Sequence, residues 1–108
     1  QEAVEGVDVD ESVGRYCVAL AKATRAHPQV LTGASPRGSL ALVLVARALA
    51  VLRGRDYVVP EDVKAVAVPV LSHRITLRPE LWMSDASTDQ VLATVLSTVA
   101  APATLEPV

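Results

Sequence analysis

A nearly continuous apolar run, Leu40–Leu52, constrains the fold of this 108-residue chain more than any other feature. Ser35 before it is a good helix N-cap, Pro36 suits the first helical position, and Gly54 after it supplies a C-terminal stop. The run is therefore predicted to form a helix, Pro36–Arg53. Because this helix is apolar nearly all round, we expect it to be the central helix of a bundle, contacted on most of its sides.

Three more helices are predicted from capping residues and apolar spacing: one from Asp10 to Pro28, one from Pro60 through a kink at Pro69, and one that a Ser87–Gln90 capping box begins. Residues 74–86 are predicted to be an irregular extended connection, with strand-like alternation that ends before Pro79. The fold class is all-α, a small four-helix bundle that accommodates a short extended segment between its third and fourth helices. Residues 1–9 are expected to be a linker, 10–100 the bundle and 101–108 a disordered tail.

The composition restricts the partners and the compartment. The net charge is −2 with a pI near 5.6, so no field attracts nucleic acid or acidic lipid. One cysteine, Cys17, excludes an internal disulfide and suits a reducing cytoplasm, and no apolar run is long enough for membrane insertion. The 51% apolar content admits two interpretations, a face covered by something outside this chain or a well-filled core. The start at Gln1, with no signal-peptide pattern, indicates a piece of a longer protein.

The sequence lacks the parts of a self-contained enzyme. It has no Gly-x-x-x-x-Gly-Lys-Ser/Thr loop for nucleotide phosphates and no acidic pair after an apolar strand to hold magnesium. No metal site is predicted, since His27 and His73 stand far apart and suit helix ends. Arg55 and Asp56 are expected to pair locally. Val59 is a poor N-cap, so packing is expected to hold the start of the helix at Pro60.

Arg37 is the candidate functional residue, because it lies where a cation is poorly placed for stability. In the first turn of its helix it meets the positive end of the helix dipole. An anion from outside would reverse that penalty, since helix N-termini bind phosphate and arginine grips phosphate oxygens in a bidentate fork. The alternative is an exposed arginine that happens to begin a helix, and the dipole argument alone leaves both interpretations open.

Several motifs, in one order and spacing, resemble the C-terminal lid of MoxR-family AAA+ ATPases. The likeness covers about residues 7–100. The segments that carry it are Ala23–Pro28, Gly33–Gly38, Ala46–Ala50, Leu52–Val58, Val59–Ala65 and Leu71–Arg74. The resemblance implies a small helical lid that follows a larger α/β nucleotide-binding core.

The resemblance also implies roles for particular residues. Arg37 falls on the sensor-2 arginine, which reaches the γ-phosphate of ATP and stabilises the charge that develops during hydrolysis, a catalytic role. Ser35 would shape the helix start and Pro36 would fix its backbone, completing the cofactor-binding set. ATP and magnesium would be bound by the parent protein and not by this fragment alone. Whether Arg37 serves its own subunit or a neighbour stays open.

The implied partners are the AAA+ core of the same chain, neighbouring subunits in a ring and a protein with a von Willebrand A domain, in a chaperone-like role. Two rival interpretations come from other classes. A helix-turn-helix DNA-binding domain needs a basic recognition helix, which no predicted helix supplies. A helical scaffold would dock a partner through an exposed aliphatic face and never contact nucleotide.

Overall fold

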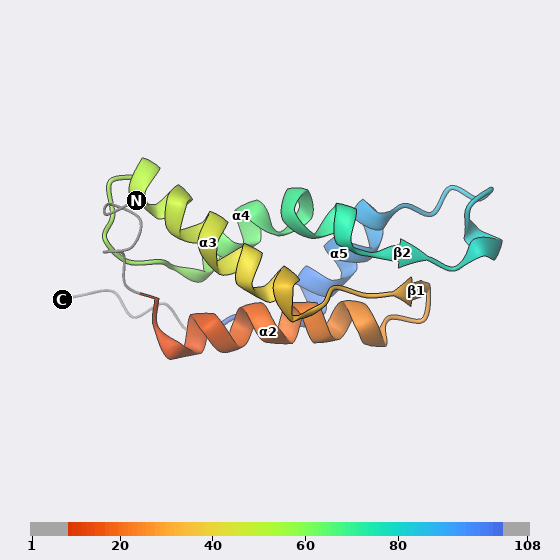
Figure 1. Cartoon of the computed structure of the whole chain (residues 1–108), viewed down its shortest axis with the longest axis horizontal. Coiled ribbons are helices and arrows are strands. Elements are labelled where there is room, and N and C mark those ends of the chain that lie inside the picture. The colour runs from red at the N-terminus through yellow and green to blue at the C-terminus, as the bar shows by residue number, and fades with distance from the viewer. Residues whose placement is uncertain (1–8, 103–108) are drawn as a thin grey trace.

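A computed structural model describes residues 9–102 of the chain. The linker predicted for residues 1–9 and the tail predicted for 101–108 lie almost entirely outside these residues. Four α-helices form in the described part, and they confirm the small all-α bundle. The elements are α2 (Glu11–Ala26), β1 (Val30–Thr32), α3 (Pro36–Leu52), α4 (Pro60–Leu71), β2 (Thr76–Leu77) and α5 (Thr88–Thr98), with short 3₁₀ turns at Ser72–Arg74 and Pro79–Leu81 (Figure 1).

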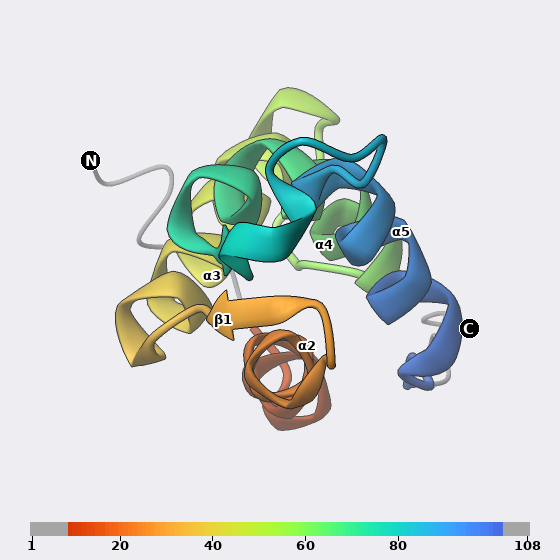
Figure 2. The ribbon, with the colours of Figure 1, turned by 90° about the vertical axis from the view of Figure 1, so that its right-hand side faces the viewer.

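Helix α4, and not α3, is the central helix of the bundle. It packs against α2, α3 and α5, whereas α3 packs mainly against α4 and α2. In Figure 2, α3 and α5 lie on opposite sides of the molecule and α2 runs below them. The prediction that α3 is contacted on most of its sides is therefore wrong.

The surface of α3 explains this error. Its buried positions carry mostly small side chains, while several large ones face solvent: Leu40, Leu44, Val45 and Leu52. Gly38, Ala46 and Ala50 are buried, and small residues at a helix contact let two backbones approach closely. A helix that is apolar all round gives no periodic signal for which face packs, so the sequence pattern could not distinguish the two sides.

The predicted helix starts are confirmed by their capping hydrogen bonds. The Asp10 carboxylate accepts from the Ser12 N–H, and the Ser35 hydroxyl oxygen accepts from the Arg37 N–H. Ser87 and Gln90 form the reciprocal capping box of α5. Helix α4 continues through Pro69 to Leu71, as the apolar spacing predicted.

The connection predicted to be irregular contains a short strand, β2, because a partner strand lies beside it. Val30 of β1 pairs with Leu77 in an antiparallel ladder, and the Arg78 N–H donates to the Gln29 carbonyl. The Arg78 Nε also donates to the Pro28 carbonyl at 2.8 Å. The sheet thus ties the loop before α3 to the segment after α4. Strand β1 has three residues, too few to show a period of two in the sequence.

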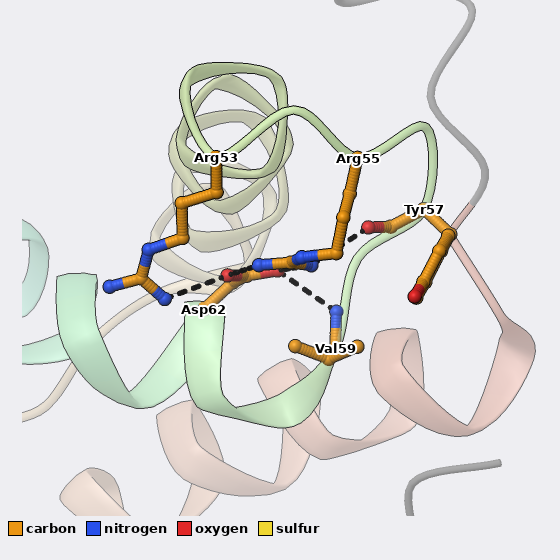
Figure 3. Close-up of polar contacts among 5 residues, drawn as sticks. All are labelled: Arg53, Arg55, Tyr57, Val59 and Asp62. Carbon is orange, nitrogen blue, oxygen red and sulfur yellow. Dashed lines mark hydrogen bonds and ion pairs between the residues drawn. The ribbon is translucent and has the colours of Figure 1, made fainter. Parts of the chain in front are cut away.

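A buried carboxylate, Asp62, joins the connection after α3 to the first turn of α4 (Figure 3). Arg55 donates to it from both terminal nitrogens, at 2.7 and 2.5 Å, and Arg53 donates at 3.2 Å. Its Oδ2 also accepts from the Val59 N–H at 3.0 Å, which caps the helix from inside. The expected pairing of Arg55 with Asp56 is thus wrong. The start of α4 is held by a side-chain cap, and not by packing alone.

The charge of Asp62 depends on these partners. Burial acts to raise the pKa of the Asp62 carboxyl, but the hydrogen bonds from Arg55 and Val59 oppose it. Together with the charges of Arg55 and Arg53, they hold that pKa below its ordinary value. The carboxylate therefore stays ionised at neutral pH although none of its side chain is exposed.

Replacing the buried carboxylate should destabilise the fold. Asp62→Ala leaves the partly buried Arg55 without its counterion and the Val59 N–H without an acceptor, so we expect a loss of about 3 kcal/mol in the free energy of unfolding. Urea unfolding followed by circular dichroism measures it. Asp56→Ala, an exposed carboxylate in the same connection, is the matched control and should change stability by less than about 0.5 kcal/mol. Equal losses in the two variants would contradict the role given to Asp62.

The lowered pKa of Asp62 also predicts a pH dependence. A carboxyl whose pKa is lower in the folded state stabilises the fold fully above its unfolded value of 3.8. That stabilisation is lost as the pH falls through the folded pKa. We expect the stability of the unmodified chain to fall more steeply below pH 3.8 than that of Asp62→Asn, measured by urea unfolding across this range. Parallel pH profiles would contradict the assignment.

Candidate functional site

The predicted site residues Ser35, Pro36 and Arg37 lie together at the exposed start of α3. The Arg37 side chain is exposed, and within residues 9–102 it forms no ion pair with an acid. Two of the first backbone N–H groups are already used, because the Arg37 N–H donates to the Ser35 hydroxyl oxygen and the Gly38 N–H to the Ser35 carbonyl. The guanidinium is therefore the group of this helix start that remains available for an anion.

Helix α2 fixes the loop from which α3 begins. Thr24 is fully buried. Its hydroxyl oxygen accepts from the Ala34 N–H at 2.9 Å, and the hydroxyl group donates to the Ala21 carbonyl. Arg25 donates from its Nη1 to the Ala34 carbonyl. Both polar backbone groups of Ala34 are thus held by consecutive residues of α2, so the direction in which α3 leaves the loop is determined.

Gly33 allows this loop to lie directly on the backbone of α2. A Cβ added at Gly33 would meet the Arg25 Cα at 2.5 Å and the Arg25 backbone nitrogen at 2.6 Å, closer than real Cβ contacts. No side chain fits at position 33 unless the loop moves away from the helix. The glycine is required here for close approach, and the start of α3 depends on it.

A second arginine lies beside the first turn of α3. A Cβ added at Gly38 would be 3.6 Å from the Arg74 side chain, so Arg74 packs over this turn from the segment after α4. Arg74 also forms no ion pair with an acid in the part of the chain that the structure describes. Arg37 and Arg74, neither of which pairs with an acid among residues 9–102, therefore come from different elements to one end of α3.

The cysteine and the first histidine considered from the sequence have structural roles. Cys17 is fully buried, and burial raises the pKa of its thiol to about 11, so it is inert core packing at neutral pH. His27 ends α2, where its Nδ1 accepts from the Gln29 N–H. Among the described residues, no group of three His, Cys, Asp or Glu side chains is placed to hold a metal ion.

Sequence reasoning identified Arg37 but missed the residues that position it. Thr24 and Arg25 stood in a segment that carried the family resemblance, and no role was given to them. A signal was present for Thr24, which lies four residues after the buried Leu20 and continues the inner face of α2. A hydroxyl on a buried helix face requires a hydrogen-bond partner, and here the partners are backbone groups.

Comparison with known proteins gives a consistent family assignment. A family model described as an AAA lid domain matches residues 22–95. The Bacillus subtilis protein YeaC is 39% identical over 94% of this chain and 32% of its own length. The Mycobacterium tuberculosis protein named chaperone MoxR1 is 40% identical over 94% of this chain and 29% of its own length.

A solved structure agrees with this assignment. A crystal structure from Cytophaga hutchinsonii, described as that of a candidate ATPase, superposes with a TM-score of 0.89 and 36% identity. The superposed region covers 94% of this chain and 34% of the chain in the solved structure. The chain thus spans about a third of the length of the proteins that it matches. No helix in the described residues is long and apolar enough to cross a membrane.

Filling the space at Gly33 should displace the start of α3. Gly33→Ala places a methyl group against the Arg25 backbone, so we expect a loss of about 2 kcal/mol or more in the free energy of unfolding. Gly14→Ala in α2 is the matched control, because a Cβ there meets nothing within 4 Å. That control should gain about 0.5–1 kcal/mol, since alanine favours a helix interior over glycine. Similar changes in both variants, measured by urea unfolding, would contradict the close approach.

Proposed function

Since this chain belongs to the AAA lid domain family, as the lid of a MoxR-like AAA+ ATPase, we propose that it senses the γ-phosphate of bound ATP through Arg37. One observation carries the proposal. The Arg37 guanidinium is exposed and forms no ion pair with an acid in the described residues, at the start of a helix whose position α2 holds. The positive end of the α3 dipole makes an approaching anion favourable at this place.

The chemistry of Arg37 suits a phosphoryl group. A guanidinium donates two parallel hydrogen bonds to phosphate oxygens and stays charged at any physiological pH. During hydrolysis negative charge is spread over the oxygens of the transferred phosphoryl group, and an arginine placed there in advance stabilises it. Ser35 and Pro36 contribute indirectly, because they fix the backbone from which the side chain extends.

The described residues fit one part of an ATP site and not the rest. An arginine at a helix start can contact phosphate, but no described group of acidic side chains is placed to bind magnesium. The phosphate-binding loop and the magnesium ligands would belong to the AAA+ core of the full-length protein. Hydrolysis is accordingly proposed for that protein and not for the lid alone.

The bundle would pass a movement of Arg37 to the rest of the lid. Thr24 and Arg25 attach the loop before α3 to α2, and β1 attaches the same loop to β2 after α4. A displacement of Arg37 by a bound phosphate would therefore act on α2, α3 and the β1–β2 pair together. We propose that this connection couples the nucleotide state to contacts between neighbouring subunits of a ring, in the cytoplasm. We also propose a chaperone-like action on a partner with a von Willebrand A domain, which the MoxR resemblance implies.

Removing the Arg37 side chain should strongly reduce turnover and leave the fold intact. In the full-length protein, Arg37→Ala is expected to lower the ATP hydrolysis rate about 100-fold or more, because the transition state loses a cation. The melting temperature should not fall, since the side chain is exposed and its charge is unfavourable at the positive end of the α3 dipole. A phosphate-release assay measures the rate.

The matched control is Arg15→Ala, an exposed arginine on α2 that pairs with Glu11. This variant also removes one positive charge, but it does so on α2 and not at the start of α3. It should hydrolyse ATP at the rate of the unmodified protein. Unchanged hydrolysis in Arg37→Ala, or an equal loss in Arg15→Ala, would refute the sensor role.

A further inference from the structure

Arg74 is an exposed arginine that the proposed function does not use. It ends the 3₁₀ turn Ser72–Arg74, directly after α4. Helices α3 and α4 pack against each other and run in opposite directions, so the end of α4 lies beside the start of α3 (Figure 1). Arg74 therefore approaches the turn that carries Arg37 from a different element.

The aliphatic part of Arg74 lies over the first turn of α3. Its Cδ would be 3.6 Å from a Cβ added at Gly38, the residue that follows Arg37. The guanidinium begins one bond beyond that Cδ, so it is confined to the surroundings of this turn. Within the described residues it donates no hydrogen bond and pairs with no acid.

Two other arginines at this end of the bundle are held by the backbone. Arg25 donates to the Ala34 carbonyl, and Arg78 donates to the Pro28 carbonyl. Arg37 and Arg74 have no such contact for their guanidinium groups among residues 9–102. Two free guanidinium groups beside one turn repel each other, and the positive end of the α3 dipole adds to that repulsion. An anion that carries more than one charge would reverse it.

We propose that Arg74 is a second phosphate-binding residue, which shares the γ-phosphoryl group of ATP with Arg37. This inference rests on the proposed function, because it takes the anion at Arg37 to be that group. A terminal phosphoryl group has three acceptor oxygens and carries about two negative charges at neutral pH. A bidentate arginine occupies two of these oxygens and compensates one charge. One oxygen and about one charge remain for the cation that Arg74 supplies.

Nucleotide binding to the full-length protein tests this contact. Arg74→Gln keeps most of the aliphatic chain over Gly38 and removes the charge. We expect the affinity for a non-hydrolysable ATP analogue to fall about 10-fold, because a charge-assisted hydrogen bond is lost. The affinity for ADP should change less than about 2-fold, since ADP has no γ-phosphoryl group. Isothermal titration calorimetry with magnesium present measures both. Unchanged affinity for the analogue, or an equal loss for both nucleotides, would overturn the proposal.

The matched control is Arg78→Gln, which removes a charge at the same end of the bundle. The Arg78 Nε is already held by the Pro28 carbonyl, and Arg78 follows Arg74 by four residues along an extended segment. This variant should change the affinity for the ATP analogue less than about 2-fold, because exposed charges at a distance are screened by salt. A loss equal to that of Arg74→Gln would indicate a general effect of charge and would overturn the contact.

The hydrolysis rate of Arg37→Ala separates this inference from the proposed function. Reduced hydrolysis in Arg37→Ala, with unchanged affinity of Arg74→Gln for the ATP analogue, would overturn the role of Arg74 alone. Unchanged hydrolysis in Arg37→Ala, with an ATP-selective loss of affinity in Arg74→Gln, would refute the sensor role of Arg37 and still support the contact of Arg74 with the γ-phosphoryl group.

Discussion

The contact of the loop before α3 with the backbone of α2 determines most of what this lid can do. Gly33 lies where a Cβ would collide with Arg25, and Thr24 and Arg25 hold both backbone groups of Ala34. The next residue, Ser35, caps α3. The direction of the helix and the outward position of Arg37 follow from this short region.

Four arginines near the two ends of α3 fall into two groups that the sequence alone does not separate. Arg53 and Arg55 pair with the buried Asp62, and they hold the connection between α3 and α4 in place. Arg37 and Arg74 lie near the opposite end of α3 and pair with no acid in the described residues. The net charge of −2 does not show this arrangement, because it sums all charged side chains whatever their partners.

The sequence predicted the parts of the fold that depend on local chemistry. The caps at Asp10, Ser35 and Ser87 are interactions within three residues, so they can be read from the residues themselves. The β1–β2 pair joins residues far apart in the chain, and the partner of Arg55 lies seven residues away on the next helix. The packed face of α3 depends on its contacts with α4 and α2, which the local sequence does not show. The site was predicted at Arg37, but the contacts that position Arg37 are long-range and were not.

The central claim is that the exposed Arg37 side chain binds a phosphate that another domain supplies. The most direct measurement is a structure of the full-length protein with a non-hydrolysable ATP analogue bound. The account predicts at least one Arg37 guanidinium nitrogen about 2.7–2.9 Å from a γ-phosphate oxygen, the length of a charge-assisted hydrogen bond. An Arg37 side chain that instead points into solvent, or pairs with a carboxylate while the nucleotide is bound, would contradict it.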